Sequence, residues 1–173
     1  MADIEFTDNS AAVREAIDDA IIAFLYEAGG ELEAKAKRNT IPPHYGEYDV
    51  KNSWKYDVNE AQAETKVGSA MEAAFWAEFG TGEHALNHDG RRGWWVYVDG
   101  NNNRTENQKY YTEDEAKATA ASMRANGIPA HATNGTEPVR PLFNAFNSRK
   151  NALIRRFSAI MNERISADDN SST

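Results

Sequence analysis

The sequence contains no cysteine, and this absence excludes several kinds of chemistry. There is no disulfide framework, no thiolate nucleophile and no cysteine-based zinc site, so a bound metal would need histidine and carboxylate ligands. Long apolar runs are also missing: the longest, residues 20–26, is far shorter than the roughly 20 residues of a membrane-spanning helix. The first residues, Met-Ala-Asp-Ile-Glu, are acidic, whereas a secretory signal peptide begins with positive charge. We therefore expect a protein made in the cytosol, with no membrane partner.

Familiar catalytic motifs are missing as well. The chain has no Gly-x-Ser-x-Gly elbow, no phosphate-binding loop and no dinucleotide-binding glycine fingerprint. Its only histidine cluster, His84 and His88, lies in a polar Gly-, Asn- and Asp-rich stretch, which favours a solvated loop over a metal site. Glu78 stands out because its neighbours are apolar, and we interpret it as partly buried and charge-paired rather than catalytic. We expect no enzymatic activity, no metal and no cofactor.

The charges that are present are unevenly distributed. The 173 residues carry 19 Lys and Arg against 27 Asp and Glu, a net charge of −8. Residues 138–167 carry six basic side chains against one acidic one, a net of +5, whereas residues 1–34 have a net of −8. This opposition suggests head-to-tail pairing between copies, although a solvated basic helix face is an equally open interpretation. The candidate contact residues in the basic segment are Arg155, Arg156 and Arg164.

Two stretches have the apolar period of amphipathic helices, residues 10–38 and residues 138–165. Gly29 and Gly30 lie inside the first stretch, where glycine is unfavourable, so we expect a kink or a close helix contact there. Residues 166–173 are small and polar, and we expect them to form a flexible tail.

Between these helices the period changes to two. Residues 53–58 and 63–68 alternate apolar and polar side chains, which is typical of two strands of a hairpin. A short helix is expected over residues 70–79, and the Gly-Thr-Gly sequence at residues 80–82 ends it.

Residues 93–135 have the pattern of a strand–helix–strand insert. Residues 93–99 form an aromatic strand between glycines, followed by a polar loop expected at residues 101–108. A capping box then opens a helix, and residues 128–133 are expected to form a second strand.

The aromatic strand places Trp94 on one face and Trp95 on the other. Stacking platforms for nucleic acids interleave such rings with Lys or Arg, and this strand has none within it. We therefore interpret both tryptophans as core or protein-contact residues. Taken together, the patterns predict one α+β domain over residues 1–173: a small, mostly antiparallel sheet of residues 53–58, 63–68 and 93–99, packed by two long amphipathic helices.

Four short sequences occur in an order that resembles a known family. They are Ser-Trp-Lys at residues 53–55, Val-Gly-Ser at 67–69, Ala-Phe-Trp-Ala-Glu-Phe-Gly-Thr-Gly at 74–82 and Pro-Val-Arg-Pro-Leu-Phe at 138–143. This order resembles the tail-completion, or head–tail joining, proteins of tailed bacteriophages, also described as minor tail or neck proteins. The chain departs from the family pattern at Asn144, where an arginine is usual, and in its Trp-rich insert.

The resemblance implies a structural virion protein, assembled in the host bacterial cytoplasm, that forms a ring of six copies at the head–tail junction. Its partners would be copies of itself, neighbouring neck or connector proteins and a tail-terminator or tail-tube protein. Genomic DNA would pass through the ring without sequence-specific contact, which suits an acidic protein. The residues that the resemblance and the exposed aromatic pattern mark as interaction candidates are Trp76, Glu78, Phe79, Gly80, Thr81, Gly82, Trp94, Trp95, Arg140, Pro141 and Leu142.

Residues 76–82 are expected to lie against the start of the last helix, which makes Glu78 and Arg140 candidates for a charge pair within one chain or between copies.

Two alternatives from other functional classes stay open. The insert is similar in outline to half of the sporulation-related repeat, which would imply binding to cell-wall glycan. A small hydrolase would use Glu78 with His84 or His88.

Overall fold

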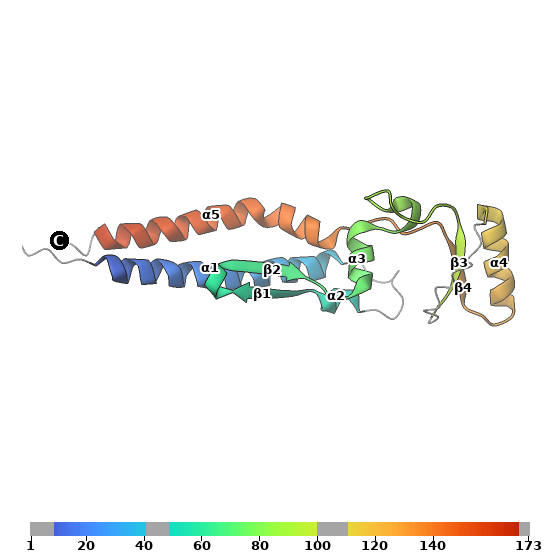
Figure 1. The fold of residues 1–173 in the computed structure, drawn as a ribbon, viewed down its shortest axis with the longest axis horizontal. Coiled ribbons are helices and arrows are strands. Elements are labelled where there is room, and N and C mark those ends of the chain that lie inside the picture. Colours follow the sequence, from blue (N-terminus) through green and yellow to red (C-terminus); the bar gives the residue numbers. More distant parts are fainter. Residues whose placement is uncertain (1–8, 41–48, 100–110, 170–173) are drawn as a thin grey trace, which may run out of the picture.

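The computed structural model describes residues 9–40, 49–99 and 111–169, and its backbone is elongated (Figure 1). A pair of long helices forms one end, and a small unit of strands and one helix forms the other. Five α-helices and two antiparallel sheets occur in these residues, so the predicted α+β class with long terminal helices is confirmed. The loop expected at residues 101–108 lies outside the described residues.

Helices α1 (Ser10–Asn39) and α5 (Pro141–Asp169) run antiparallel side by side. The rings of Phe24 and Phe157 are 5.1 Å apart between centroids, and Leu153 is buried against α1. No helix in the described part of the chain is long and apolar enough to cross a membrane.

The last helix differs from its expected bounds at both ends. It begins at Pro141 rather than at residue 138, because the backbone N–H groups of Val139 and Arg140 both donate to the carbonyl of Ala77. It continues to Asp169, because no glycine or proline stops it, so residues 166–169 of the expected tail are helical, and residues 170–173 lie outside the described residues.

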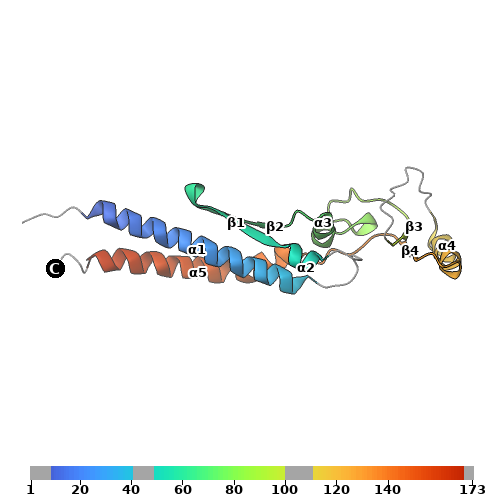
Figure 2. The same cartoon turned by 90° about the horizontal axis from the view of Figure 1, so that it is seen from below.

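The hairpin of β1 (Lys55–Asn59) and β2 (Glu64–Gly68) confirms the expected strand pair. Figure 2 shows α1 lying between this hairpin and α5. The close contact expected near the glycine pair is made with the hairpin rather than with another helix: a Cβ at Gly29 would lie 2.5 Å from Cδ2 of Tyr56 and 2.8 Å from Oγ1 of Thr65. Glycine therefore lets the hairpin rest directly on the helix backbone.

A second core lies where α1 ends, around α2 (Val50–Ser53) and α3 (Glu72–Phe79). Trp54 is buried there, and its Nε1–H donates to Oγ1 of Thr40 over 2.8 Å. Trp54 therefore belongs to the core beneath α3 and precedes β1, whereas the sequence pattern placed it inside the strand.

The insert forms a sheet of its own, so the expectation of one sheet that includes residues 93–99 is wrong. Among the described residues, strand β3 (Trp95–Val98) pairs only with β4 (Ala130–Thr133), and α4 (Glu113–Ala125) packs on this pair. The physical reason is the position of the insert beyond α3, at the opposite end of the molecule from the β1–β2 hairpin (Figure 1). The predicted capping box is confirmed at Thr112 and Glu115.

Candidate functional site at the joint of α3 and α5

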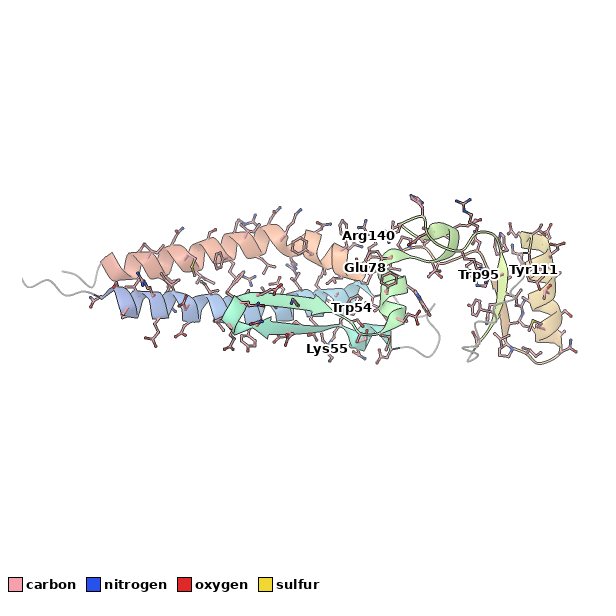
Figure 3. The ribbon with its side chains drawn as sticks, viewed as in Figure 1. Trp54, Lys55, Glu78, Trp95, Tyr111 and Arg140 are labelled. Carbon is pink, nitrogen blue, oxygen red and sulfur yellow. The ribbon has the colours of Figure 1, made fainter. Side chains whose placement is uncertain are left out.

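The end of α3 meets the start of α5 through the carboxylate of Glu78. Its Oε2 accepts the backbone N–H of Leu142 and its Oε1 accepts that of Phe143, each over 2.9 Å. The first N–H groups of a helix have no partner within the helix, and the helix dipole favours a negative charge beside them. Glu78 therefore caps α5 from another element, in a joint that is labelled in Figure 3.

Within the described chain Arg140 forms no charge pair with Glu78, whereas a pair between copies stays a prediction. Its guanidinium carbon lies 3.5 Å from the ring centroid of Phe143, and both oxygens of Glu78 are occupied by backbone donors. The two residues nevertheless lie in the same joint (Figure 3). Arg140 has φ +56°, a left-handed conformation that is uncommon outside glycine and is held in place here by its hydrogen bond to Ala77.

The remaining residues of the two motifs also come together. Trp76 and Leu142 pack against the core around Trp54, and Pro141 is fully buried. The carbonyl of Pro141 accepts a hydrogen bond from Nδ2 of Asn39 over 3.0 Å, which ties the end of α1 to the start of α5. Ala77 and Glu78 therefore contact the start of the last helix as expected, whereas residues 80–82 contact residues 134–138 instead.

The Gly-Thr-Gly sequence forms the base of the insert. The N–H of Thr81 donates to the carbonyl of Thr136 over 3.0 Å, and the N–H of Thr136 donates to Oγ1 of Thr81 over 2.9 Å. A Cβ at Gly82 would collide with the carbonyl of Asn134, and Gly82 has φ +60°. Glycine is needed here because two backbone segments cross at close range.

The histidine-containing loop has a structural role. Nδ1 of His84 lies 2.8 Å from Oε1 of Glu137, and Glu83 accepts hydrogen bonds from the N–H of Gly93 and from Nδ2 of Asn134. The hydrogen bond from Gly93, followed by that from Asn134, lowers the pKa of Glu83. Among the described residues, no group of three or more His, Asp or Glu side chains could hold a metal ion.

Exposed aromatic rings surround the joint. Phe75 and Phe79 lie on α3 with centroids 4.7 Å apart, and they are 56% and 36% exposed. Phe143 and Phe146 on the first turns of α5 are 42% and 52% exposed. Large apolar side chains gathered on a surface are typical of contact sites between proteins.

The basic residues of α5 divide into two groups. Arg156 pairs with Glu27 and Glu31 of α1 at 2.6 and 3.1 Å, and Arg149 pairs with Glu31 at 3.2 Å. Both side chains have an ion-pair partner within the chain, so the expectation that Arg156 faces another copy is not supported by its position. Arg155 and Arg164 are exposed and form no ion pair with any described residue.

Trp95 is the first residue of β3, and Trp94, directly before it, forms an isolated bridge with Tyr111; the two rings have different neighbours. Lys117 of α4 lies 5.5 Å from the ring centroid of Trp94, whereas Trp95 is covered by Arg91 at 4.9 Å and touches the backbone at Gly82. Trp95 therefore packs at the base of the insert, and Figure 3 shows it apart from Glu78 and Arg140.

Sequence reasoning missed two parts of this site. The partner of Glu78 is a pair of backbone N–H groups, which leave no trace in the sequence. The second part is the exposed apolar side of α5, which did leave a trace in the sequence, because the apolar residues of α5 occupy more of the helix circumference than one neighbouring helix can cover.

Comparison with known proteins adds no identification. No family model matches the chain, and neither a curated protein nor a solved structure matches it.

Proposed function

We propose that the protein is a structural subunit of the head–tail junction of a tailed bacteriophage, where copies form a ring around the DNA passage. One observation carries the proposal: two of the four short sequences that resemble the tail-completion family, residues 74–82 and 138–143, meet in a single joint. Glu78 from the first element caps the helix that the second element opens. Because residues of the two short motifs bind each other in the folded chain, a chance match of two separate motifs is a poorer explanation of the resemblance.

The surface around the joint supports an assembling protein. Four phenylalanines of α3 and α5 are exposed there, although the chain buries mostly alanine in its core. A ring subunit needs such surfaces, because it contacts a neighbour on each side, and head-to-tail contacts close into a ring when the rotation between copies permits. The net charge of −8 suits a protein that surrounds DNA without holding it.

The test is to inactivate the gene in the genome that carries it and to inspect the resulting particles by electron microscopy. We expect DNA-filled heads and free tails that are not joined, and we expect expression of the protein from a plasmid to restore joined particles. Normal joined particles in the inactivated strain would overturn the proposal. A portal or connector gene upstream and a tail-tube gene downstream would be the expected neighbours.

A second variant separates a folding defect from an assembly defect. Phe75→Ser together with Phe79→Ser removes two exposed rings from α3 without touching the buried core. We expect this protein to fold with the wild-type helical content and to fail in restoring joined particles. Exchange of an exposed residue of the insert, Ala121→Ser, is the matched control and should restore them.

A further inference from the structure

The side chain of Arg140 has no hydrogen-bond acceptor among the described residues. Its Nε atom is buried and unpartnered, and its guanidinium carbon lies 3.5 Å from the ring centroid of Phe143. A guanidinium carries five N–H donors and stays charged in proteins, so a buried donor of this kind normally has an acceptor. Arg140 is therefore a cation held in one place at the partly exposed surface of the joint, with no described acceptor for its donors (Figure 3).

The fold alone does not explain why this residue is arginine. Its φ of +56° is a left-handed conformation, which glycine and asparagine adopt most readily. Its backbone carbonyl accepts a helical hydrogen bond from the N–H of Asn144, and Glu78 supplies the capping acceptor that a residue at this position normally provides. Residues held in such conformations occur preferentially at binding and switch sites. The guanidinium is thus the part of Arg140 that the fold leaves without a task.

The aromatic rings near Arg140 define the kind of surface to which it belongs. Phe143, under the guanidinium, is 42% exposed, and Phe75, Phe79 and Phe146 at the joint are 36% to 56% exposed. We name these four rings and Arg140 the joint surface. Aromatic residues and arginine are enriched at contacts between proteins. A partner that covers the rings would exclude water from the guanidinium, and an ion pair formed there would be stronger than one in water.

The charges nearby distinguish between two possible anions, a carboxylate of a protein and a phosphate of DNA. Residues 69–90, which include α3 and the loop after it, contain four acidic residues and no lysine or arginine. DNA binding requires several cations along the phosphate backbone, and one arginine beside an acidic segment, in a chain of net charge −8, does not supply them. One carboxylate, by contrast, matches the planar donor groups of one guanidinium.

We propose that Arg140 binds a carboxylate of a different protein, on an acidic segment whose apolar side chains cover the exposed rings of the joint surface. Because Nε is buried, the terminal Nη groups would donate to the carboxylate, while Phe143 supports the guanidinium from one face. Permanent contacts between copies of one chain are more apolar than this, whereas arginine among aromatic rings suits a contact between proteins that fold separately. The inference rests on the proposed function, because it names the chemistry of a partner at the head–tail junction.

Three small probes test the charge and the apolar part of the joint surface separately. Phenylpropionate carries a carboxylate and a ring, phenylpropanamide has the same ring without the charge, and acetate has the charge without the ring. Each probe is titrated into the isotope-labelled full chain, and the Nε–H signal of Arg140 is followed by NMR. This signal should be observable, because the buried Nε is protected from exchange with water.

We expect phenylpropionate to bind about tenfold more tightly than the amide or acetate, and to shift the signals of Arg140 and Phe143. Binding should be lost in Arg140→Gly, which should fold normally because glycine adopts a φ of +56° readily. Arg14→Ala is the matched control and should bind like the wild type, because Arg14 is an exposed arginine at the opposite end of α1 from the joint. Circular dichroism checks that both variants are folded.

Three results would overturn the proposal. The first is equal affinity for phenylpropionate and its amide, or unchanged binding in Arg140→Gly. The second is a DNA duplex of about twelve base pairs that shifts the Arg140 signal while phenylpropionate does not, which would assign the guanidinium to phosphate. The third is an Arg140 signal that shifts with the concentration of the protein alone, which would assign the guanidinium to a second copy.

The same variant separates this inference from the proposed function. Arg140→Gly expressed from a plasmid should fail to restore joined heads and tails, whereas Arg14→Ala should restore them. Restoration by Arg140→Gly would overturn the carboxylate contact and leave the proposed junction protein standing. Joined particles in the inactivated strain would overturn the proposed function, whatever the three probes bind.

Discussion

The two ends of the molecule bury their apolar side chains in different ways. In the insert, Ala116 and Ala120 of α4 and Ala130 of β4 are buried within a unit that is closed by its own strands and helix. At the helical end, α1 and α5 contact each other along one face each, while Ile154 and Ile165 remain more than half exposed. The insert thus buries these side chains with its own elements, whereas the helical end leaves large apolar side chains exposed.

The largest expected loss of stability follows from a change in the core that links the two ends. Trp54→Ala removes a buried ring and its hydrogen bond to Thr40, and we expect the free energy of unfolding to fall by about 3–5 kcal/mol. Urea unfolding followed by circular dichroism measures this loss. Trp94→Ala in the insert is the control, and a loss of similar size there would mean that the insert and the helical end unfold as one unit.

The next effect concerns the cap of α5. Glu78→Gln keeps one acceptor oxygen but loses the charge and one of two hydrogen bonds to the helix N-terminus, and we expect a loss of about 1–2 kcal/mol. The same urea experiment measures it, with Glu163→Gln on the exposed side of α5 as the control. Equal stability of Glu78→Gln and the wild type would show that the cap contributes nothing.

A smaller loss of stability should be confined to the insert. Thr112→Ala removes the side-chain cap of α4, which typically costs about 1 kcal/mol. Amide hydrogen exchange should become faster in α4 and remain unchanged in α1 and α5. Faster exchange in the long helices would contradict the independence of the insert.

The smallest effect is a dependence on pH at the base of the insert. The pKa of Glu83 is lowered by hydrogen bonds from Gly93 and Asn134, so the stabilisation is present above the ordinary glutamate pKa and is lost as pH falls through the lowered value. The NMR signal of the Gly93 amide should titrate with a midpoint below about 4.3, the ordinary value for glutamate. Glu83→Gln should abolish this transition, and its persistence would assign the transition to another group.

Local patterns in the sequence predicted much of this fold. The periods of α1, α5 and the β1–β2 hairpin, and the capping box at Thr112, depend on residues close together in the chain. Which strands share a sheet depends on distant contacts, so the separate β3–β4 sheet could not be derived in this way. Gly29 is an intermediate case, because a glycine inside a helix indicates a close neighbour without identifying it.

The candidate site could be predicted only in part, because its contacts join residues that are distant in the chain. Apolar neighbours marked Glu78 as a partly buried and paired residue, and Glu78 is half-buried and hydrogen-bonded, but a backbone N–H group has no signature that distinguishes it from the arginine expected as its partner. The pairing of Arg156 with α1 rather than with another copy follows from the antiparallel arrangement of two helices distant in sequence. Net charge alone could not separate these paired residues from Arg155 and Arg164.

The crossing of the two segments at Thr81 and Thr136 has an evolutionary consequence. The chain leaves the helical end at Thr81 and returns to it at Thr136, and these two residues are hydrogen-bonded neighbours. The residues between them can therefore be replaced by a longer or shorter segment without any change in the helices and strands outside them. Domain insertion is best tolerated at such points. We expect lineages of this protein to differ most at this position, acquiring or losing whole modules there while the helices beneath them keep their lengths.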